Sequence, residues 1–472
     1  MVRIFGHFVP ASTLILGLAE SALISVAVYV LLLPVDALYA RLAPVGFALG
    51  PLQFAVILAG LTVLAMTAVG LYSQDAFRDY RVMVIKILLA FALAMPAAFL
   101  AALFFNNVIG GAVNVWSLWY LKAAFVWFVC IVLTRAIFAQ LTDGNTFKRR
   151  VLVIGTGERA ERVMNGARRG RQSHYLPLAF VRACGDPLCV PASPFVLEET
   201  TNGDQLADFA LTLGAQEVVI ATDDRRGLPV RQLLHCKLRG LQVVDYLSFW
   251  ERENGRIDLE ALQPSWLIFS DGFRTGWIVD AVKRSVDVIA SAAVLVLTAP
   301  LLLATALAVK LESPGPILYR QERVGLRGKT FTLLKFRSMR VDAEQDGTPQ
   351  WAMKADPRVT RIGTFIRKVR IDELPQLLNV LRGDMSFIGP RPERRYFVDQ
   401  LASQIPFYSE RHSVKPGISG WAQINYPYGA SLEDARQKLA YDLYYVKNRT
   451  VFLDLLILVQ TAKVILFPEG AR

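Results

Sequence analysis

Residues 368–392 read Lys368-Val-Arg370-Ile-Asp372-Glu373-Leu-Pro375-Gln-Leu-Leu-Asn379-Val-Leu-Arg382-Gly-Asp384-Met-Ser386-Phe-Ile-Gly389-Pro390-Arg391-Pro392, and the rest of the chain is organised around this stretch. Two adjacent carboxylates stand directly before a helix signal, in which proline suits the first turn and leucines follow at helical spacing. The carboxylates could simply satisfy the free N–H groups of that helix. Arginines and lysines crowd both flanks, however, and carboxylates among such cations also suit a phosphate-handling site. Both interpretations are open on this stretch alone.

Neighbouring segments supply a pattern that is more specific than the carboxylate pair. Five motifs follow one another, namely Lys335-Phe-Arg337-Ser-Met339, Ile371-Asp-Glu-Leu-Pro-Gln376, Gly383-Asp-Met-Ser386, Gly389-Pro-Arg-Pro392 and Lys415-Pro-Gly-Ile-Ser-Gly-Trp-Ala-Gln423. In this order they resemble the bacterial sugar transferases that move a hexose-1-phosphate onto a polyprenyl phosphate, the monotopic phosphoglycosyl transferases. The resemblance covers roughly residues 277–467, and the whole chain resembles the long form of that family.

The resemblance implies a two-step displacement. Asp372 is expected to attack the β-phosphate of a UDP-sugar, release UMP and form a phosphosugar-enzyme ester, which undecaprenyl phosphate then attacks. Glu373 is expected to orient the site, to hold Mg²⁺ together with Asp372, or to manage a proton. Among long-form members glucose is the first choice of hexose and galactose the second, so exopolysaccharide or another surface polysaccharide is the expected product pathway.

The motif positions also predict substrate-binding residues. The expected phosphate ligands are the basic side chains Lys335, Arg337, Arg367 and Arg391, because arginine binds phosphate in a bidentate manner. Each of them taken singly could equally be a solvated surface base. The expected nucleotide pocket contains Trp421, Gln423 and Asn425.

Composition narrows the class of protein. The chain has 472 residues, 53% of them apolar, a formal charge of +12 and a positive mean hydropathy, which together indicate several domains and membrane segments. Interleaved aromatics and RNA-type motifs are not evident, so anionic lipid headgroups and phosphorylated substrates are expected partners rather than nucleic acid. The cysteines Cys130, Cys184, Cys189 and Cys236 form no CxxC or His/Cys cluster, which predicts free thiols and no zinc site.

Residues 1–145 are expected to form a four-helix transmembrane bundle. Each of four apolar runs, at residues 13–33, 45–72, 82–105 and 116–138, can span a bilayer core as a helix. Positive charges before the first run and after the fourth place both ends of the bundle in the cytoplasm. Glu20, inside the first run, is expected to be satisfied within the bundle rather than to line a transport path.

Residues 146–274 are expected to form a Rossmann-like accessory domain. Arg150–Ile154 is typical of a buried strand, and Gly155 and Gly157 follow it as half of a dinucleotide fingerprint. Further strands are expected at residues 178–181, 217–221 and 242–246. No acidic residue is placed to hold a ribose 2′-OH, and the chain has no Tyr-x-x-x-Lys pair, so a non-catalytic module is expected. The alternatives are a membrane-bound nucleotide-sugar dehydratase or epimerase, or a non-catalytic scaffold of polysaccharide assembly.

Residues 275–472 are expected to form an α/β monotopic catalytic domain with a re-entrant membrane helix at about residues 283–311. Pro300 stands in the middle of this apolar run and predicts a bend or break. Basic residues flank both ends, which favours a helix that enters and leaves on one side over a kinked spanning helix. The resemblance implies the same form, although relatives carry Ser-Pro where this chain has Ala299-Pro300.

The remaining pattern predicts two strands, at residues 317–321 and 330–336, and helices at 361–369, 374–381, 392–404, 431–447 and 451–467. The last of these helices is expected to be interfacial or packed rather than spanning. The predicted fold class is therefore a membrane protein with a helical bundle, a Rossmann-like domain and a catalytic domain. The protein is expected in the bacterial inner membrane, in contact with the lipid bilayer and with its catalytic domain on the cytoplasmic face. A homodimer is a further expectation that the sequence leaves open.

Overall fold

The computed structural model divides the chain into two compact units, Met1–Ile4 with Phe8–Phe249 and Phe5–His7 with Trp250–Arg472. It describes residues 2–4, 7–9, 11–42, 51–69, 71–72, 80–109, 116–141, 148–168, 173–183, 186–192, 196–197, 205–226, 228, 230–273, 276–340, 358–427, 429 and 431–466. Cys184 lies outside these residues. Two three-residue strands, β1 (Val2–Ile4) and β2 (His7–Val9), pair near the N-terminus.

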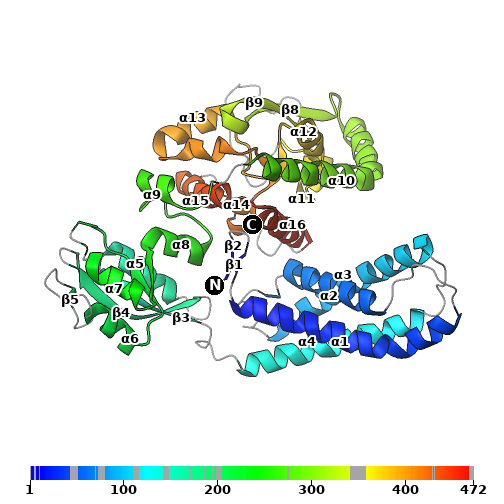
Figure 1. Cartoon of the computed structure of the whole chain (residues 1–472). Helices are drawn as coiled ribbons and strands as arrows, with labels where there is room; N and C mark the ends of the chain where they lie inside the picture. Colours follow the sequence, from blue (N-terminus) through cyan, green and yellow to red (C-terminus); the bar gives the residue numbers. More distant parts are fainter. Residues whose placement is uncertain are drawn as a thin grey trace. The chain divides into compact units, whose positions relative to one another are not determined.

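Four long helices follow in the first unit and coincide with the predicted apolar runs, except that residues 45–50 of the second run lie outside the described residues (Figure 1). They are α1 (Ala11–Leu42), α2 (Pro51–Val69), α3 (Tyr80–Ile109) and α4 (Trp116–Leu141). One apolar cluster joins them, in which Ile24, Leu58, Ala90 and Trp127 are fully buried. The close packing of these side chains holds the four helices together through van der Waals contacts. By length and composition, two described helices could cross a bilayer: α1, through its segment Leu14–Leu31, and α10 of the second unit, described below.

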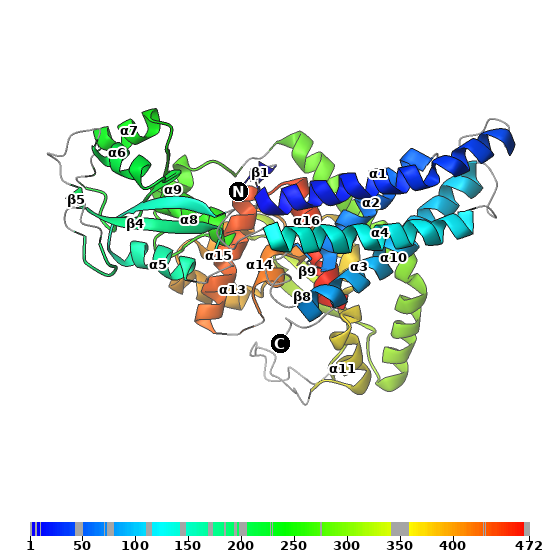
Figure 2. The same cartoon turned by 90° about the horizontal axis from the view of Figure 1, so that it is seen from below.

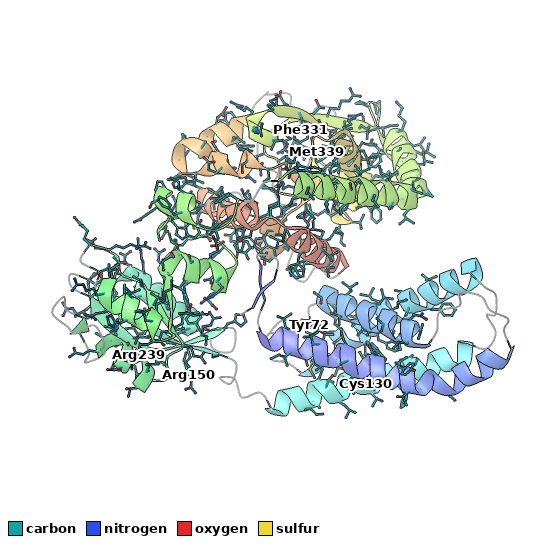
Figure 3. The ribbon with its side chains drawn as sticks, in the orientation of Figure 1. Tyr72, Cys130, Arg150, Arg239, Phe331 and Met339 are labelled. Carbon is teal, nitrogen blue, oxygen red and sulfur yellow. The ribbon has the colours of Figure 1, made fainter. Side chains whose placement is uncertain are left out.

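A buried ion pair lies inside this helical cluster. Glu20 Oε1 lies 2.7 Å from Arg135 Nε, and Tyr72 Oη donates to Glu20 Oε2 at 2.7 Å. Arg135 also donates to the backbone carbonyl of Leu71. Figure 3 shows Tyr72 and Cys130 among the helices of the first unit. The prediction that Glu20 is satisfied within the helices is confirmed, since its charge is paired and hydrogen-bonded rather than isolated.

The Rossmann-like part of the first unit is a five-stranded parallel sheet with the order β5-β4-β3-β6-β7. Its strands are β3 (Arg149–Ile154), β4 (Tyr175–Ala183), β5 (Val196–Leu197), β6 (Glu217–Ile220) and β7 (Gln242–Asp245). Figure 2 shows α6 (Gln205–Thr212) and α7 (Val230–Leu238) on one face and α5 (Glu158–Ala167) on the other. Such two-sided cover explains why the strands read as continuous apolar runs. The four strands expected from the sequence are confirmed, and only the two-residue β5 was not predicted.

The second unit contains the motif-bearing half of the chain. After α10 (Trp277–Glu312), an antiparallel ribbon pairs β8 (Leu318–Val324) with β9 (Thr330–Phe336). A mixed region follows, with helices α11 (Arg361–Lys368), α12 (Gln376–Arg382), α13 (Arg395–Gln404), α14 (Trp421–Asn425), α15 (Leu432–Asn448) and α16 (Val451–Leu466), and with strands β10 (Ser386–Ile388) and β11 (Gly417–Ser419). The predicted strands and helices of this region are confirmed within a few residues at each end.

Helix α10 continues through Pro300 without interruption, and its ribbon bends along its length (Figure 1). Proline removes one backbone donor, so a bend rather than a break is the observed outcome. Thr298 Oγ1 donates to the carbonyl of Val294 at 2.7 Å in the turn before the proline. Both ends of the helix contact the same unit. Near the start, Arg284 donates to the carbonyls of Val380 and Leu381 at the end of α12.

Residues 250–273 pack with the catalytic unit rather than with the sheet domain. This segment contains the end of α8 (Tyr246–Asn254) and the whole of α9 (Pro264–Phe269). Glu251 accepts from Lys447 Nζ at 2.6 Å and from Asn448 Nδ2 at 2.7 Å, and all three side chains are buried. The division between the two compact units lies at residues 249–250, whereas the boundary predicted for the Rossmann-like domain is residue 274. The sequence pattern missed this because the contacts join segments almost 200 residues apart.

Two sets of close contacts fix the region around the dyad, the adjacent carboxylates Asp372 and Glu373. Asn379 is fully buried and replaces a strand neighbour for β9: its Oδ1 accepts from Leu334 N, and its Nδ2 donates to the Thr332 carbonyl. A Cβ at Gly389 would collide with the Lys415 carbonyl, so the parallel pair β10 and β11 can form only with glycine there. These contacts set where α12 and the Gly-Pro-Arg-Pro turn stand.

Candidate active site

Asp372 and Glu373 lie in a 3₁₀ turn, Ile371–Glu373, immediately before α12. Arg370 precedes this turn in the left-handed conformation (φ 60°), which reverses the chain after α11. Pro375 occupies the N-cap position of α12, and no side chain caps the helix there. Among the described residues, neither carboxylate accepts a hydrogen bond from the first N–H groups of α12, so the geometry gives no support to the capping interpretation.

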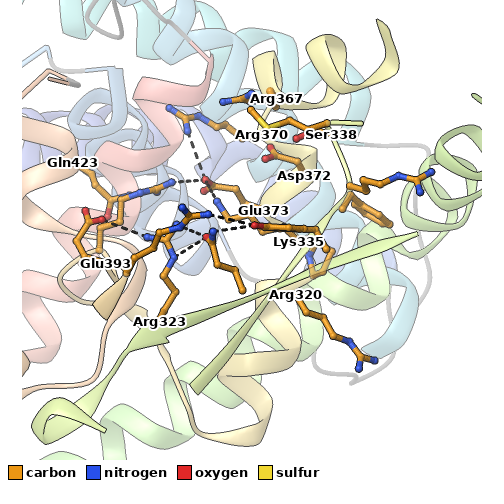
Figure 4. A pocket seen from close by; sticks show the side chains of 18 of the residues that line it. Arg320, Arg323, Lys335, Ser338, Arg367, Arg370, Asp372, Glu373, Glu393 and Gln423 are labelled. Atoms are coloured by element: carbon orange, nitrogen blue, oxygen red, sulfur yellow. Dashed lines mark hydrogen bonds and ion pairs between the residues drawn. The ribbon is translucent and has the colours of Figure 1, made fainter. Parts of the chain in front are cut away.

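Glu373 is held by three cations. Arg391 Nη2 donates to its Oε1 at 2.7 Å, Lys335 Nζ lies at 3.3 Å from the same oxygen, and Arg370 Nη1 lies at 3.7 Å (Figure 4). Burial alone would raise the pKa of Glu373, but the charges of Arg391 and Lys335 outweigh it and hold that pKa well below its usual range. Glu373 is thus ionised over the whole physiological pH range and gathers basic side chains around the dyad.

Asp372 has the opposite surroundings. Its side chain is 7% exposed, and its Oδ1 is buried without a hydrogen-bond partner among the described residues. Burial raises the pKa of Asp372, and the neighbouring charge of Glu373 raises it further, against the opposing charges of Lys335 and Arg367. An unsatisfied carboxylate oxygen in a buried position is costly, so such an atom is typical of a group kept ready for a ligand or a reaction.

Lys335 and Arg367 approach the dyad from two elements. Lys335 extends from β9, and burial lowers the pKa of its ammonium while Glu373 opposes that shift. Arg367 extends from the last turn of α11 and lies beside Asp372 in Figure 4. Among the described residues the side chain of Arg367 makes no hydrogen bond or ion pair, so its guanidinium donors are available to a phosphate.

Two further arginines hold the backbone of Arg391 in place. Arg411 Nη2 donates to the Arg391 carbonyl at 3.0 Å, and Arg323 Nη1 donates to the Pro392 carbonyl at 3.1 Å. Arg411 is itself paired with the buried Asp442 of α15, with 2.7 Å between Nη2 and Oδ2. The turn that presents Arg391 to Glu373 is therefore fixed from both sides by charge-assisted hydrogen bonds.

Arg337, predicted as a phosphate ligand, lines the same cleft as the dyad, but its guanidinium is used in contacts within the second unit. Its side chain is buried, and its guanidinium donates to the carbonyls of Val309, Ser313 and Pro314 and to Ser313 Oγ, at the C-terminal end of α10. β9 ends at Phe336, so Arg337 leaves the strand alternation that directs Lys335 to the dyad. A cation among the last carbonyls of a helix satisfies groups that otherwise have no partner. Arg337 is a helix-capping residue.

Trp421 does not fit the predicted nucleotide pocket. Its indole Nε1 donates to the Gly255 carbonyl at 2.7 Å, and its ring stacks on Tyr444 with centroids 5.7 Å apart. These contacts hold the ring in the packing between α15 and the connector, which is the segment of residues 250–273. An indole that donates to a backbone carbonyl and stacks on a second ring is held in place by both contacts.

Gln423 and Asn425, which were predicted for the nucleotide pocket, line the cleft that contains the dyad. The cleft has a volume of about 2010 Å³ and extends from apolar residues of α10, such as Leu302 and Ala306, to polar residues of α15, such as Lys438. Gln423 Oε1 is a buried acceptor without a hydrogen-bond partner in the described part of the chain. One wall is thus apolar and the dyad wall strongly basic, which suits a ligand with a phosphate and an apolar tail.

The sequence analysis missed Arg323, Arg411 and Asp442 as parts of the site. One signal was present: Asp442 is a carboxylate among Leu439, Leu443 and other apolar residues of a helix, and a charge on a buried helix face requires a partner. The partner itself could not be read from the pattern, because Arg411 lies in a separate 3₁₀ segment, Tyr408–Ser413.

The carboxylate oxygens of Asp372 and Glu373 differ in how well they suit the expected Mg²⁺. Asp372 fits, since its Oδ1 is an unsatisfied carboxylate oxygen and magnesium commonly uses one or two carboxylates together with substrate phosphates. Glu373 fits less well, because the Oε1 that would bind the ion already accepts from Arg391 and lies close to Lys335. In the described residues no group of three or more His, Cys, Asp or Glu side chains converges as a metal centre. A metal would therefore be held mainly by Asp372 and the substrate.

The comparisons with known proteins agree with this geometry. The sequence model of the bacterial sugar transferase family matches residues 278–468, and that of a CoA-binding domain matches residues 67–234. The chain is 33% identical over 371 residues to UDP-glucose:undecaprenyl-phosphate glucose-1-phosphate transferase from Escherichia coli (strain K12), which covers 76% of both chains.

Two further relatives match shorter regions. One is UDP-N-acetylgalactosamine-undecaprenyl-phosphate N-acetylgalactosaminephosphotransferase from Aeromonas hydrophila, 46% identical over 250 residues, 53% of this chain and 58% of that protein. The other, a UDP-glucose:undecaprenyl-phosphate glucose-1-phosphate transferase from Caulobacter vibrioides (strain ATCC 19089 / CIP 103742 / CB 15), is 45% identical over 195 residues, 41% of this chain and 73% of that protein. With the dyad, its cationic ligands and these matches taken together, the chain belongs to the bacterial sugar transferase family.

Proposed function

We propose that this protein transfers a sugar 1-phosphate from a UDP-sugar to undecaprenyl phosphate and releases UMP. The names of the relatives support the reaction class. The observation that carries the proposal is the arrangement of the dyad: Asp372 has a buried oxygen without a partner, and the adjacent Glu373 gathers Arg391 and Lys335.

In the first step Asp372 attacks the phosphorus that bears the sugar. A bond forms between its carboxylate oxygen and that phosphorus, and the bond from phosphorus to the UMP oxygen breaks, so UMP leaves with the electron pair. Lys335, Arg367 and Arg391 neutralise the charge of the transferring phosphoryl group. Because Glu373 already holds two of these cations, they are in place before the donor arrives, which lowers the cost of organising the site.

In the second step the phosphate oxygen of undecaprenyl phosphate attacks the same phosphorus, and Asp372 leaves as a free carboxylate. Splitting the transfer in this way lets UMP depart before the lipid acceptor reacts. The apolar wall of the cleft, formed by α10, is suited to the first isoprene units of the acceptor. When bound, Mg²⁺ would supply charge neutralisation at the donor diphosphate, with Asp372 as its protein ligand.

We also propose that α10 enters and leaves the lipid on one side, and that the four helices of the first unit span the inner membrane. Supporting this, α10 is apolar and mostly exposed, with Trp277, Leu297, Leu303, Leu307 and Leu311 directed away from the protein core. Its start contacts α12 through Arg284, and its end is capped by Arg337 of the same unit. Attachment of both ends of α10 to one unit supports entry and exit on the same face of the bilayer.

Glucose is the proposed sugar, because the relative aligned over most of both chains carries that name. N-acetylgalactosamine, named in the Aeromonas relative, and galactose are the competing donors. A panel of UDP-glucose, UDP-galactose and UDP-N-acetylgalactosamine, scored by UMP release with undecaprenyl phosphate present, identifies the substrate. Fastest release from a donor other than UDP-glucose contradicts the choice of glucose.

The reaction is tested with Asp372→Asn in the purified full-length protein. Loss of the attacking carboxylate is expected to reduce turnover by about three orders of magnitude or more, since no other group can form the ester. The matched control is Asp399→Asn, at an exposed position of α13 where the carboxylate pairs only with Arg395.

Covalent chemistry is tested separately by omitting the acceptor. The wild type incubated with a donor labelled in the sugar is expected to retain label on the protein, and the label is expected on a peptide containing Asp372. Near wild-type turnover by Asp372→Asn, or label on another residue, would show that the nucleophile is assigned wrongly.

A further inference from the structure

The glycine turn after β3 is the place where a Rossmann-like domain binds the phosphates of a nucleotide. There the free N–H groups at the start of a helix point toward an anion, and the helix dipole favours negative charge. In this chain the turn comprises Gly155, Thr156 and Gly157 and leads into α5. Strands β4 and β6 lie on either side of β3 and run parallel to it. The loops that follow these two strands therefore lie at the same edge of the sheet as the glycine turn.

An internal carboxylate already occupies the start of α5. Asp223, in the loop after β6, accepts from the backbone N–H of Glu158 at 2.8 Å and of Arg159 at 3.2 Å, one through each carboxylate oxygen. The guanidinium of Arg159 donates to the Thr222 carbonyl at 3.0 Å and reinforces the same loop. Asp223 therefore makes the two backbone contacts that a bound phosphate would make.

A second carboxylate closes the turn from the other side. Asp186, in the loop after β4, is buried and accepts from Thr156 N and from Asp223 N, both at 3.3 Å. Thr156 Oγ1 donates to the Pro187 carbonyl, so this hydroxyl is also used internally. Three N–H groups of the turn and helix start thus have carboxylate partners from within the chain.

The contact of Asp223 with the start of α5 also explains why residue 157 is a glycine. A Cβ at Gly157 would collide with Asp223 Oδ2, so glycine is needed here for the approach of the chain's own aspartate. Glu158 and Glu161 add negative charge in the first turn of α5. A pyrophosphate at this turn would meet four carboxylates and find three of the backbone donors taken.

We propose that Asp223 is the built-in anion of this module, and that the domain does not bind CoA or a dinucleotide at the β3–α5 turn. The match to a CoA-binding domain model then reflects the fold, whereas the phosphate position is filled from within. The domain is a closed structural module whose glycine turn is locked by Asp223 and Asp186. This inference does not depend on the transferase reaction.

The test follows amide hydrogen exchange of the peptide that contains Glu158 and Arg159 in the full-length protein. In the wild type, CoA or NAD at millimolar concentration is expected to leave exchange of this peptide unchanged. In Asp223→Ala the peptide is expected to exchange roughly tenfold faster, because two N–H groups lose a charged partner. Added sulfate is expected to restore slow exchange in the variant, because the vacated position then accepts an anion.

The control variant is Asp224→Ala, at the adjacent exposed residue, whose side chain pairs with Arg226. Its exchange in the same peptide is expected to equal that of the wild type. If Asp223→Ala proves too unstable to purify, Asp223→Asn retains the shape and loses the charge, and an intermediate rate is expected. Protection of the wild-type peptide by CoA or NAD overturns the proposal, and so does wild-type exchange in Asp223→Ala.

Discussion

Asp372 and Glu373 are neighbours in the chain, yet their surroundings move the pKa of one carboxyl up and that of the other down. Burial raises the pKa of Asp372, whereas the basic side chains around Glu373 hold its pKa low. Two titratable groups whose pKa values are pushed apart are typical of a divided chemical task. The raised pKa makes the ionised Asp372 a stronger nucleophile, and the permanently ionised Glu373 fixes the cations.

The first prediction concerns Lys335, whose positive charge lowers the pKa of Asp372. In Lys335→Met that charge is gone, so the pKa of Asp372 rises further and a smaller fraction is ionised at low pH. The acid limb of the plot of kcat/KM against pH is therefore expected to move to higher pH by about one unit. The measurement is UMP release across pH with each profile scaled to its own maximum.

Lys329→Met is the matched control, since this exposed lysine also belongs to the β8–β9 ribbon but is remote from the dyad. Its acid limb is expected to coincide with that of the wild type. A Lys335→Met profile with an unmoved acid limb would mean that another group sets the pH dependence.

Sequence motifs located the residues that act through their own segment. Asp372, Lys335 and Arg391 could be predicted because each stands at a fixed place in a short motif. The capping contacts of Arg337 could not be predicted, because the pattern gives a basic residue two positions after Lys335 but not the end of the strand between them. Arg411 and Asp442 could not be paired from sequence, because their contact joins separate elements.

At the scale of elements, α10 is held at both ends by arginines that bind backbone carbonyls. The hydrophobic run predicted the helix, and its length predicted a lipid-facing element. The pattern could not predict that Pro300 bends the helix without ending it, because this depends on packing around the missing hydrogen bond. Nor could it predict that the helix ends are tied to the catalytic unit.

The second prediction separates the capping role of Arg337 from a substrate-binding role. Arg337→Lys keeps the charge but loses the planar fork that reaches the carbonyls of Val309, Ser313 and Pro314. The catalytic unit is expected to be destabilised by about 2 kcal/mol, with the KM for the UDP-sugar unchanged. Denaturant unfolding and initial-rate kinetics are the two measurements.

Arg320→Lys, at an exposed arginine lining the same cleft, serves as the control and is expected to leave stability within error. A severalfold rise of KM in Arg337→Lys at unchanged stability would restore the phosphate-ligand interpretation.

At the scale of the whole molecule, the chain is organised as two units that divide within α8. Composition and hydropathy predicted the sequence of helical, Rossmann-like and catalytic parts, but not this division. The connector is recognisable only from its contacts with α15, including Lys447 Nζ at 3.8 Å from the centroid of the Trp266 ring. Membrane topology and a homodimer stay predictions at this scale.

The third prediction concerns the buried pair of Glu251 and Lys447, which joins the connector to α15. Glu251→Gln leaves the ammonium buried without its counter-charge, so the catalytic unit is expected to lose about 3 kcal/mol of unfolding free energy. The double variant Glu251→Gln with Lys447→Met is expected to lose less than Glu251→Gln alone, because methionine packs on Trp266 without a charge.

Glu433→Gln, at an exposed position near the start of the same helix, is the control for the loss of a carboxylate. Equal unfolding free energies for Glu251→Gln and the wild type would contradict the view that the connector belongs to the catalytic unit.

Lys335 and Arg337 are two residues apart, one beside the dyad and the other at the end of α10. A tilt of α10 imposed by lipid thickness would therefore move Arg337 and, through the end of β9, the Lys335 ammonium that faces Glu373. Turnover would then vary with acyl-chain length even when donor, acceptor and headgroup are the same. The thickness of the bilayer would then influence the turnover rate of such an enzyme, in addition to the bilayer supplying the acceptor.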